Sequence, residues 1–153
     1  MADKIHILYV DDEENNLISF KATFRTKYST FVAISGSEAL KILSTKQIHV
    51  IITDQRMPEM TGVEFLEKVI ELHPDCMRIL LTGYADMTAV IDAVNKGKIF
   101  HYLNKPWNEE ELDKTIAEAY NKYLENAELK KQNEELNASN NQLEFLLRQR
   151  LLS

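Results

Sequence analysis

Five polar residues, each at the end of an apolar run, carry the chemistry that this sequence can support. They are Asp11 and Asp12 after IHILYV, Asp54 after HVIIT, Thr82 after MRILL and Lys105 after IFHYLN. If these runs are parallel strands of one sheet, their carboxyl ends lie side by side along one edge. Three carboxylates, a hydroxyl and an ammonium would then converge in one cleft, a set suited to binding a hard cation and accepting a phosphoryl group.

The expected roles follow from charge. Clustered aspartates repel one another unless a cation neutralises them, and Mg²⁺ with few protein ligands and several waters fits an all-oxygen set. We expect Asp12 and Asp54 to bind it directly, and Asp11 directly or through water. Asp54 stands alone at the end of the central strand, so it is the expected nucleophile toward a phosphodonor. Lys105 and Thr82 would then contact the phosphate oxygens.

Alternating apolar runs and amphipathic stretches must position these side chains. Five βα units with short connections predict a doubly wound α/β fold, whose ligands bind where the strand order reverses. Ser37, Thr61 and Asn108 are the predicted N-terminal caps of helices. Strands are predicted at about 5–10, 30–34, 48–53, 77–81 and 99–103, and helices at about 14–27, 38–45, 62–72, 86–96 and from 109 onward.

Composition excludes several classes of protein. The net charge of −6 over 153 residues gives no basic signature for direct nucleic-acid binding. No apolar stretch approaches the roughly 18 residues of a membrane span, and the first residues do not form a signal peptide. The single cysteine, Cys76, excludes an internal disulfide and fits a reducing cytoplasm, where we expect the protein to act. A small structural residue is the favoured interpretation of Cys76 over a redox role.

Four motifs together resemble the receiver domain of response regulators in two-component signalling. They are YVDDEENNL, IITDQRMPEMTGVEFL, ILLTGYADM and FHYLNKPW, which span about 5–107. The resemblance implies a flavodoxin-like, five-stranded parallel sheet of order 2-1-3-4-5. It implies Asp54 as phosphoacceptor, and a histidine kinase or phosphotransfer protein as donor. It also implies Mg²⁺ binding by Asp12, Asp54 and the backbone carbonyl of Arg56, with Asp11 assisting.

The same resemblance assigns a signalling route away from the cleft. Thr82 and Lys105 would sense the phosphate, and Tyr102 would be an aromatic switch that turns inward when Thr82 moves. The peptide bond between Lys105 and Pro106 is expected to be cis. The signalling surface would comprise the fourth helix, fifth strand and fifth helix, at about 86–124.

Two residues beside the cleft have two interpretations. Arg56 and Tyr84 are either exposed loop residues or, as the resemblance implies, tuners of the phosphate lifetime through water access.

The C-terminal part has a different composition and a heptad pattern. We expect a receiver domain over 1–124 and a linker helix over 125–153, which has no Gly or Pro. With Leu at d and mostly Asn at a, the pattern predicts a parallel coiled-coil homodimer, against the alternative of a single solvated helix. The predicted helix runs to residue 153 without a cap or a helix-breaking residue, which suggests a fragment that precedes an output domain. The predicted seam consists of Asn126, Leu129, Asn133, Leu136, Asn140, Leu143 and Leu147.

Two rival functions are alternatives to the phosphoacceptor. A phosphatase of the haloacid-dehalogenase type needs a second Asp two residues after its nucleophile, but Glu13 follows Asp11 and Arg56 follows Asp54 at that spacing. We therefore expect no enzyme acting on external substrates. The other rival is a receiver-fold dimerisation module that works without phosphorylation.

Overall fold

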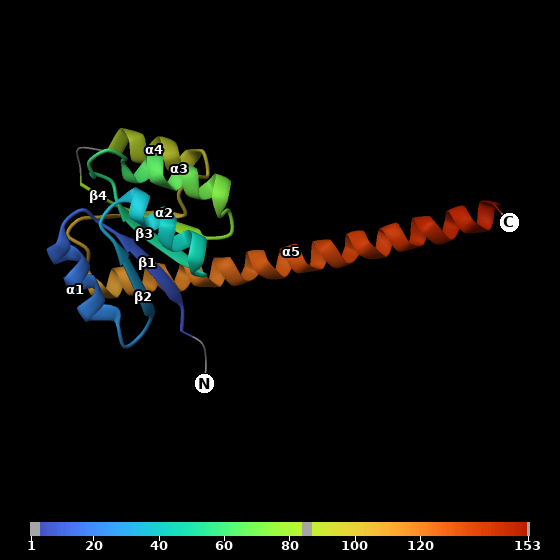
Figure 1. Cartoon of the computed structure of the whole chain (residues 1–153), viewed down its shortest axis with the longest axis horizontal. Coiled ribbons are helices and arrows are strands. Elements are labelled where there is room, and N and C mark those ends of the chain that lie inside the picture. Colours follow the sequence, from blue (N-terminus) through green and yellow to red (C-terminus); the bar gives the residue numbers. More distant parts are fainter. Residues whose placement is uncertain (1–3, 84–86, 153) are drawn as a thin grey trace. The chain divides into compact units, whose positions relative to one another are not determined.

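The computed structural model describes residues 4–83 and 87–152, and five parallel strands form its single sheet (Figure 1). The order is β2-β1-β3-β4-β5, which confirms the predicted topology. Strand order reverses between β1 and β3, so a ligand is expected beyond the carboxyl ends of these two strands. The strands are β1 His6–Val10, β2 Ser29–Ala33, β3 Val50–Asp54, β4 Met77–Thr82 and β5 His101–Asn104.

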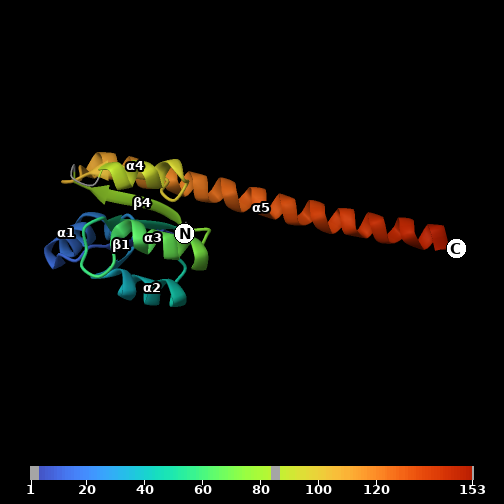
Figure 2. The same ribbon diagram turned by 90° about the horizontal axis from the view of Figure 1, so that it is seen from above.

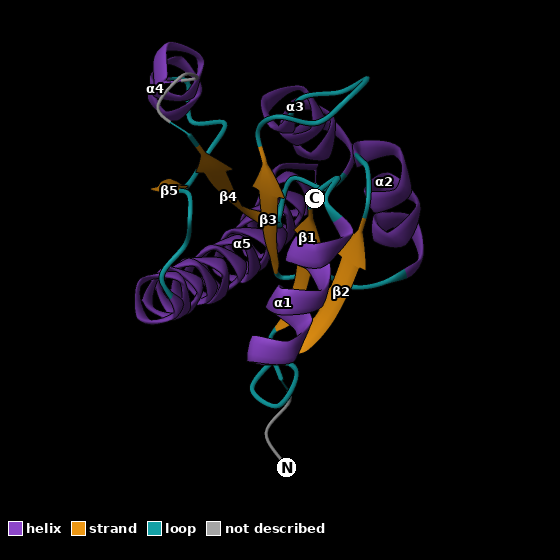
Figure 3. Ribbon diagram, turned by 90° about the vertical axis from the view of Figure 1, so that its left-hand side faces the viewer, coloured by secondary structure: helices purple, strands orange, loops and turns teal. Residues whose placement is uncertain are grey.

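Helices cover both faces of this sheet (Figure 3). One core contains buried side chains of α1 and of the first turns of α5, packed on β1 and β3. The other core contains buried side chains of α2, α3 and α4. Every residue of β3 is buried, as expected for a central parallel strand covered on both faces. The helices are α1 Glu14–Phe24, α2 Gly36–Thr45, α3 Gly62–Leu72, α4 Met87–Asn95 and α5 Glu109–Leu152.

Helix caps agree with two of the three predictions. The Thr61 side chain accepts from the Glu64 backbone N–H in a full capping box, and Asn108 Oδ1 accepts from the Glu111 N–H at 3.1 Å. The prediction of Ser37 was wrong, because α2 begins two residues earlier than predicted, at Gly36, and its cap is Ser35. Gly36 is buried against α3, and a Cβ there would lie 2.7 Å from Met60 Sδ. This close packing therefore favours a helix that begins at Gly36, which has no side chain.

Helix α1 is shorter than predicted. The periodicity predicts a helix to residue 27, but α1 ends at Phe24. The backbone N–H groups of Lys27 and Tyr28 both donate to the Phe24 carbonyl oxygen, which forms a turn into β2. Tyr28 is then buried and donates from its hydroxyl to Asp113 of α5. The tertiary contact of Tyr28 outweighs the helical pattern at this end.

The chain divides into two units by its internal contacts, Met1–Tyr123 and Leu124–Ser153. Helix α5 continues through the boundary as one helix (Figure 2). In the second unit the predicted seam leucines Leu129, Leu136 and Leu143 are 59%, 58% and 57% exposed. Across residues 4–83 and 87–152, we find no helix with the length and hydropathy needed to cross a membrane.

Candidate functional site

The five predicted residues lie at the carboxyl edge of the sheet. Asp54 and Thr82 are the last residues of β3 and β4, Asp11 and Asp12 follow β1, and Lys105 follows β5. Backbone hydrogen bonds fix these strand ends to one another. The N–H of Asp11 donates to the Ala33 carbonyl oxygen at 3.1 Å, and the N–H of Lys105 donates to the Thr82 carbonyl oxygen at 3.0 Å. The parallel register thus brings together side chains up to 94 positions apart.

Three carboxylates form the centre of the site. One oxygen from each of Asp11, Asp12 and Asp54 lies within 4.8 Å of the others. Asp11 is fully buried, Asp54 is 6% exposed, and Asp12 is partly exposed and faces solvent at one side. Such a group of hard oxygen donors fits a divalent cation that keeps several of its waters, as Mg²⁺ does. The residues present therefore fit the ion that the sequence predicts.

Lys105 supplies positive charge to this site. Its Nζ lies 3.0 Å from Asp54 Oδ2 and 3.8 Å from Asp11 Oδ2. Burial alone would lower the pKa of Lys105, but the hydrogen bond and charge of Asp54, together with Asp11, raise it. The side chain is therefore an ammonium throughout the physiological range, and it partly neutralises the carboxylate cluster.

The Asp54 carboxylate is held largely out of water. Burial raises the pKa of its carboxyl group, Lys105 opposes this effect without cancelling it, and the neighbouring charge of Asp11 adds to it. A raised pKa means that the ionised carboxylate is less stable in the folded protein than in water. A bound cation or a phosphoryl group on Asp54 would offset this unfavourable negative charge. The ionised carboxylate thus lowers the stability of the folded protein but promotes ligand binding.

Asp11 is held by three donors that sequence reasoning missed. The Tyr9 hydroxyl and Asn16 Nδ2 donate to Asp11 Oδ2 at 3.1 and 3.0 Å, and the Glu13 N–H donates to Oδ1 at 2.9 Å. Tyr9 lies two residues before Asp11 on β1, and Asn16 lies in the first turns of α1. A polar atom on an apolar strand next to the acidic pair was the available signal for Tyr9.

The remaining predicted residues surround this centre. Thr82 is buried and its hydroxyl donates to the Gly83 carbonyl oxygen at 3.0 Å. Tyr102 is half-buried on β5, paired in register with Leu80. Arg56 has an exposed side chain two residues after Asp54. Tyr84 lies outside the described residues. The peptide bond from Lys105 to Pro106 is cis, as predicted.

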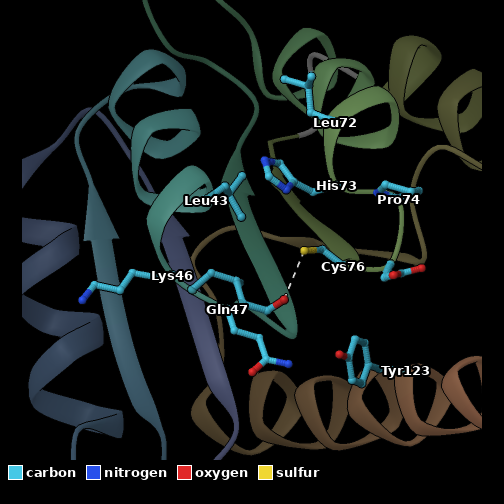
Figure 4. Close-up of a pocket in the computed structure, with 10 residues that line it drawn as sticks. Leu43, Lys46, Gln47, Leu72, His73, Pro74, Cys76 and Tyr123 are labelled. Atoms are coloured by element: carbon cyan, nitrogen blue, oxygen red, sulfur yellow. Dashed lines mark hydrogen bonds between the residues drawn. The ribbon is translucent and has the colours of Figure 1, made fainter.

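A second hollow lies at the opposite, amino edge of the strands (Figure 4). It has a volume of about 300 Å³ and is lined by residues that include Leu43, Leu72, His73, Cys76 and Tyr123. The Cys76 thiol is buried and donates to the Ile48 carbonyl oxygen at 3.1 Å. Burial raises the pKa of this thiol to about 11, so it stays protonated and unreactive near neutral pH. Cys76 is a structural residue at this edge.

Asp54→Asn is expected to stabilise the metal-free protein at neutral pH, by about 0.5–2 kcal/mol. The folded state raises the pKa of Asp54, so ionisation of this group costs stability above the folded pKa. The gain should therefore shrink as the pH falls through the folded pKa and vanish well below the ordinary value of 3.8, where both states bind the proton. Urea unfolding without divalent metal, at neutral and acid pH, measures the difference.

A matched control for this prediction is Asp113→Asn. Burial is the largest single influence and would raise the pKa of Asp113, but the hydrogen bonds from Lys27 and Tyr28 and the charge of Lys27 together lower it. Ionised Asp113 thus stabilises the folded state, and its replacement is expected to destabilise the protein at neutral pH. Equal effects of the two variants at neutral pH would contradict the assignment of Asp54 as a destabilised carboxylate.

The chain is similar in sequence to known proteins of one family. Residues 7–117 match the family model described as response regulator receiver domain. Two relatives are hydrogenase transcriptional regulatory proteins HoxA. The protein from Bradyrhizobium diazoefficiens is 35% identical over 76% of this chain, and the one from Cupriavidus necator is 38% identical over 78%. These alignments cover 24% and 25% of the relatives, so the chain spans about a quarter of their length.

A solved structure gives the same result. A response regulator receiver domain protein from Clostridium thermocellum superposes with a TM-score of 0.73 at 32% identity. The match covers 77% of this chain and 95% of that one.

Proposed function

The chain belongs to the response regulator receiver domain family, and on that premise we propose that Asp54 accepts a phosphoryl group in a Mg²⁺-dependent reaction. A sensor histidine kinase or a phosphotransfer protein would be the donor. The domain is a regulatory phosphoacceptor of two-component signalling rather than a catalytic enzyme. The observation that carries the proposal is the buried Asp54 carboxylate beside Asp11 and Asp12, with Lys105 Nζ at 3.0 Å.

The proposed reaction is an in-line displacement at phosphorus. An Asp54 oxygen attacks, the bond from phosphorus to the donor's leaving group breaks, and an aspartyl phosphate forms. Asp11, Asp12, Asp54 and the Arg56 backbone carbonyl would hold Mg²⁺, which when bound screens the charges of nucleophile and phosphate. Lys105, already beside Asp54, would pair with a phosphate oxygen.

The proposed signal starts at Thr82. Its hydroxyl now donates to Gly83 and would turn to donate to the phosphate. Movement of Thr82 leaves room for Tyr102 to turn inward from its half-buried position on β5. The change would then reach the surface made by α4, β5 and the first part of α5. Arg56 and Tyr84 would tune the lifetime of the phosphate by controlling access of water.

Intact-mass spectrometry after treatment with acetyl phosphate tests the proposal. With Mg²⁺, the expected result is a single phosphoryl adduct, and removal of the metal with a chelator should abolish it. No adduct, together with no binding of beryllofluoride, would contradict the proposal. That outcome would favour the rival function, a dimerisation module that works without phosphorylation.

The second part of the proposal concerns residues 125–153. We assign 1–124 to the receiver and 125–153 to a linker helix that forms a parallel coiled coil with a second copy of the chain. Leu129, Leu136 and Leu143 recur every seven residues on α5 and are more than half exposed, which supports a partner helix. The lone buried Cys76 supports action in the reducing cytoplasm.

A weak constitutive dimer is the expected result for the intact chain in analytical ultracentrifugation. The Asn residues at the a positions weaken the coiled coil while fixing its register, so Asn133→Leu should raise the dimer affinity. Leu136→Asn should give a monomer, because it removes a d-position anchor. The control is Phe145→Ser, since Phe145 is 60% exposed but lies off the seam. A strictly monomeric wild type at high concentration, with and without beryllofluoride, would refute the dimer.

A further inference from the structure

The orientation of the Asp11 carboxylate is set by packing rather than by solvent. Asp11 is fully buried, and Tyr9, Asn16 and the Glu13 backbone provide its hydrogen-bond donors. Buried carboxylate oxygens need such donors, because each one left unpaired costs free energy. Oδ2 is the critical atom, since Tyr9 and Asn16 both donate to it while Lys105 lies only 3.8 Å away.

Tyr9 is the more firmly placed of the two side-chain donors. It is fully buried, and its ring stacks on Phe20 of α1 with centroids 4.4 Å apart and planes 6° apart. A ring held in this way gives its hydroxyl a fixed position next to Asp11. Asn16 is less constrained, because its Nδ2 also reaches Glu13 Oε2 at 3.3 Å. Loss of the Tyr9 hydroxyl would therefore leave Asp11 Oδ2 short of one fixed donor.

The nearest donor that can replace it is Lys105. The ammonium is now shared unequally, at 3.0 Å from Asp54 Oδ2 and 3.8 Å from Asp11 Oδ2. A buried carboxylate oxygen with a missing donor attracts the closest cation. Lys105 would then move from Asp54 toward Asp11, where it would compete with a bound cation for the Asp11 carboxylate.

We propose that Tyr9, assisted by Asn16, is a positioning residue that donates to Asp11 Oδ2 and so keeps the Lys105 ammonium on Asp54 Oδ2, which leaves the Asp11 carboxylate available to the metal. This inference rests on the proposed Mg²⁺-dependent function. It assigns to Tyr9 an effect on metal affinity that acts through two other residues, without direct contact between Tyr9 and the ion.

Isothermal titration of Mg²⁺ into the intact chain tests this role without any phosphorylation. Tyr9→Phe removes one oxygen and is expected to weaken Mg²⁺ binding about tenfold, the size of effect seen when partners of metal ligands are removed. The matched control is Tyr28→Phe, since Tyr28 is also buried and donates to a carboxylate, that of Asp113, outside the three-aspartate cluster. This control should lose stability but keep its Mg²⁺ affinity.

Two further variants separate positioning from simple loss of structure. Asn16→Ala, at a partly exposed position that the fold tolerates, should weaken Mg²⁺ binding in the same direction by a few-fold. In a Lys105→Met background, Tyr9→Phe should no longer change the affinity, because the ammonium it restrains is absent. A wild-type affinity in Tyr9→Phe, or an undiminished effect in the Lys105→Met background, would overturn the inference alone. A wild type that does not bind Mg²⁺ would overturn the proposed function as well.

Discussion

Asp54→Ala is expected to lose the phosphoryl adduct entirely, with a rate of transfer from acetyl phosphate at least about a thousandfold below wild type. The substitution removes the oxygen that we propose as the nucleophile, and Asp11 is a poor replacement for it. Asp11 is fully buried, and its two oxygens already accept three hydrogen bonds, from Tyr9, Asn16 and the Glu13 backbone. Intact-mass spectrometry of wild type and variant under identical conditions measures the effect.

The control for this loss is Asp92→Ala. Asp92 is an exposed aspartate on α4 whose carboxylate pairs with Lys96, away from the sheet edge. The Asp92→Ala variant should be phosphorylated to the same extent as wild type. This result would show that loss of the adduct in Asp54→Ala does not come from removing any one aspartate. An adduct that persists in Asp54→Ala and maps to Asp12 would contradict the assignment, because Asp12 is the one partly exposed carboxylate of the three.

The location of the site was predictable because it depends on strand ends alone. Once Asp11, Asp54, Thr82 and Lys105 are recognised as following parallel strands, the hydrogen-bond register must bring them to one edge. Periodicity also identifies α3, whose start is marked by the capping box from Thr61 to Glu64. These features are local in sequence or follow from the geometry of a sheet.

The contacts within the site were not predictable, because they depend on packing between elements. Lys105 Nζ lies 3.0 Å from Asp54 and 3.8 Å from Asp11, and no pattern in the sequence indicates which of the two carboxylates is closer. The choice of Ser35 over Ser37 as a cap is similar. Both serines are good caps, and the close approach of Met60 to Gly36 decides between them.

Gly62→Ala is expected to destabilise the receiver by about 1–3 kcal/mol and to lower phosphorylation with it. A Cβ at position 62 would lie 2.4 Å from the Asp54 carbonyl oxygen, 2.8 Å from Leu80 Cδ1 and 3.0 Å from Gln55 Cα. Two of these atoms belong to the backbone of Asp54 and Gln55, so the start of α3 must move away from the end of β3. The Gly62 N–H, which donates to the Gln55 carbonyl oxygen at 2.9 Å, would move with it.

Gly36→Ala provides the comparison that makes this argument specific. Gly36 and Gly62 are both buried and both begin a helix, where alanine alone would raise helix propensity by up to about 1 kcal/mol. At Gly36 the tightest contact is the flexible end of Met60, and the next atoms are 3.4 Å away. Its variant should unfold in urea within about 1 kcal/mol of wild type and keep the adduct. If both variants behave alike, the fit of α3 against Asp54 does not hold the phosphoacceptor in place; if only Gly62→Ala fails, the glycine is part of the site although it has no side chain.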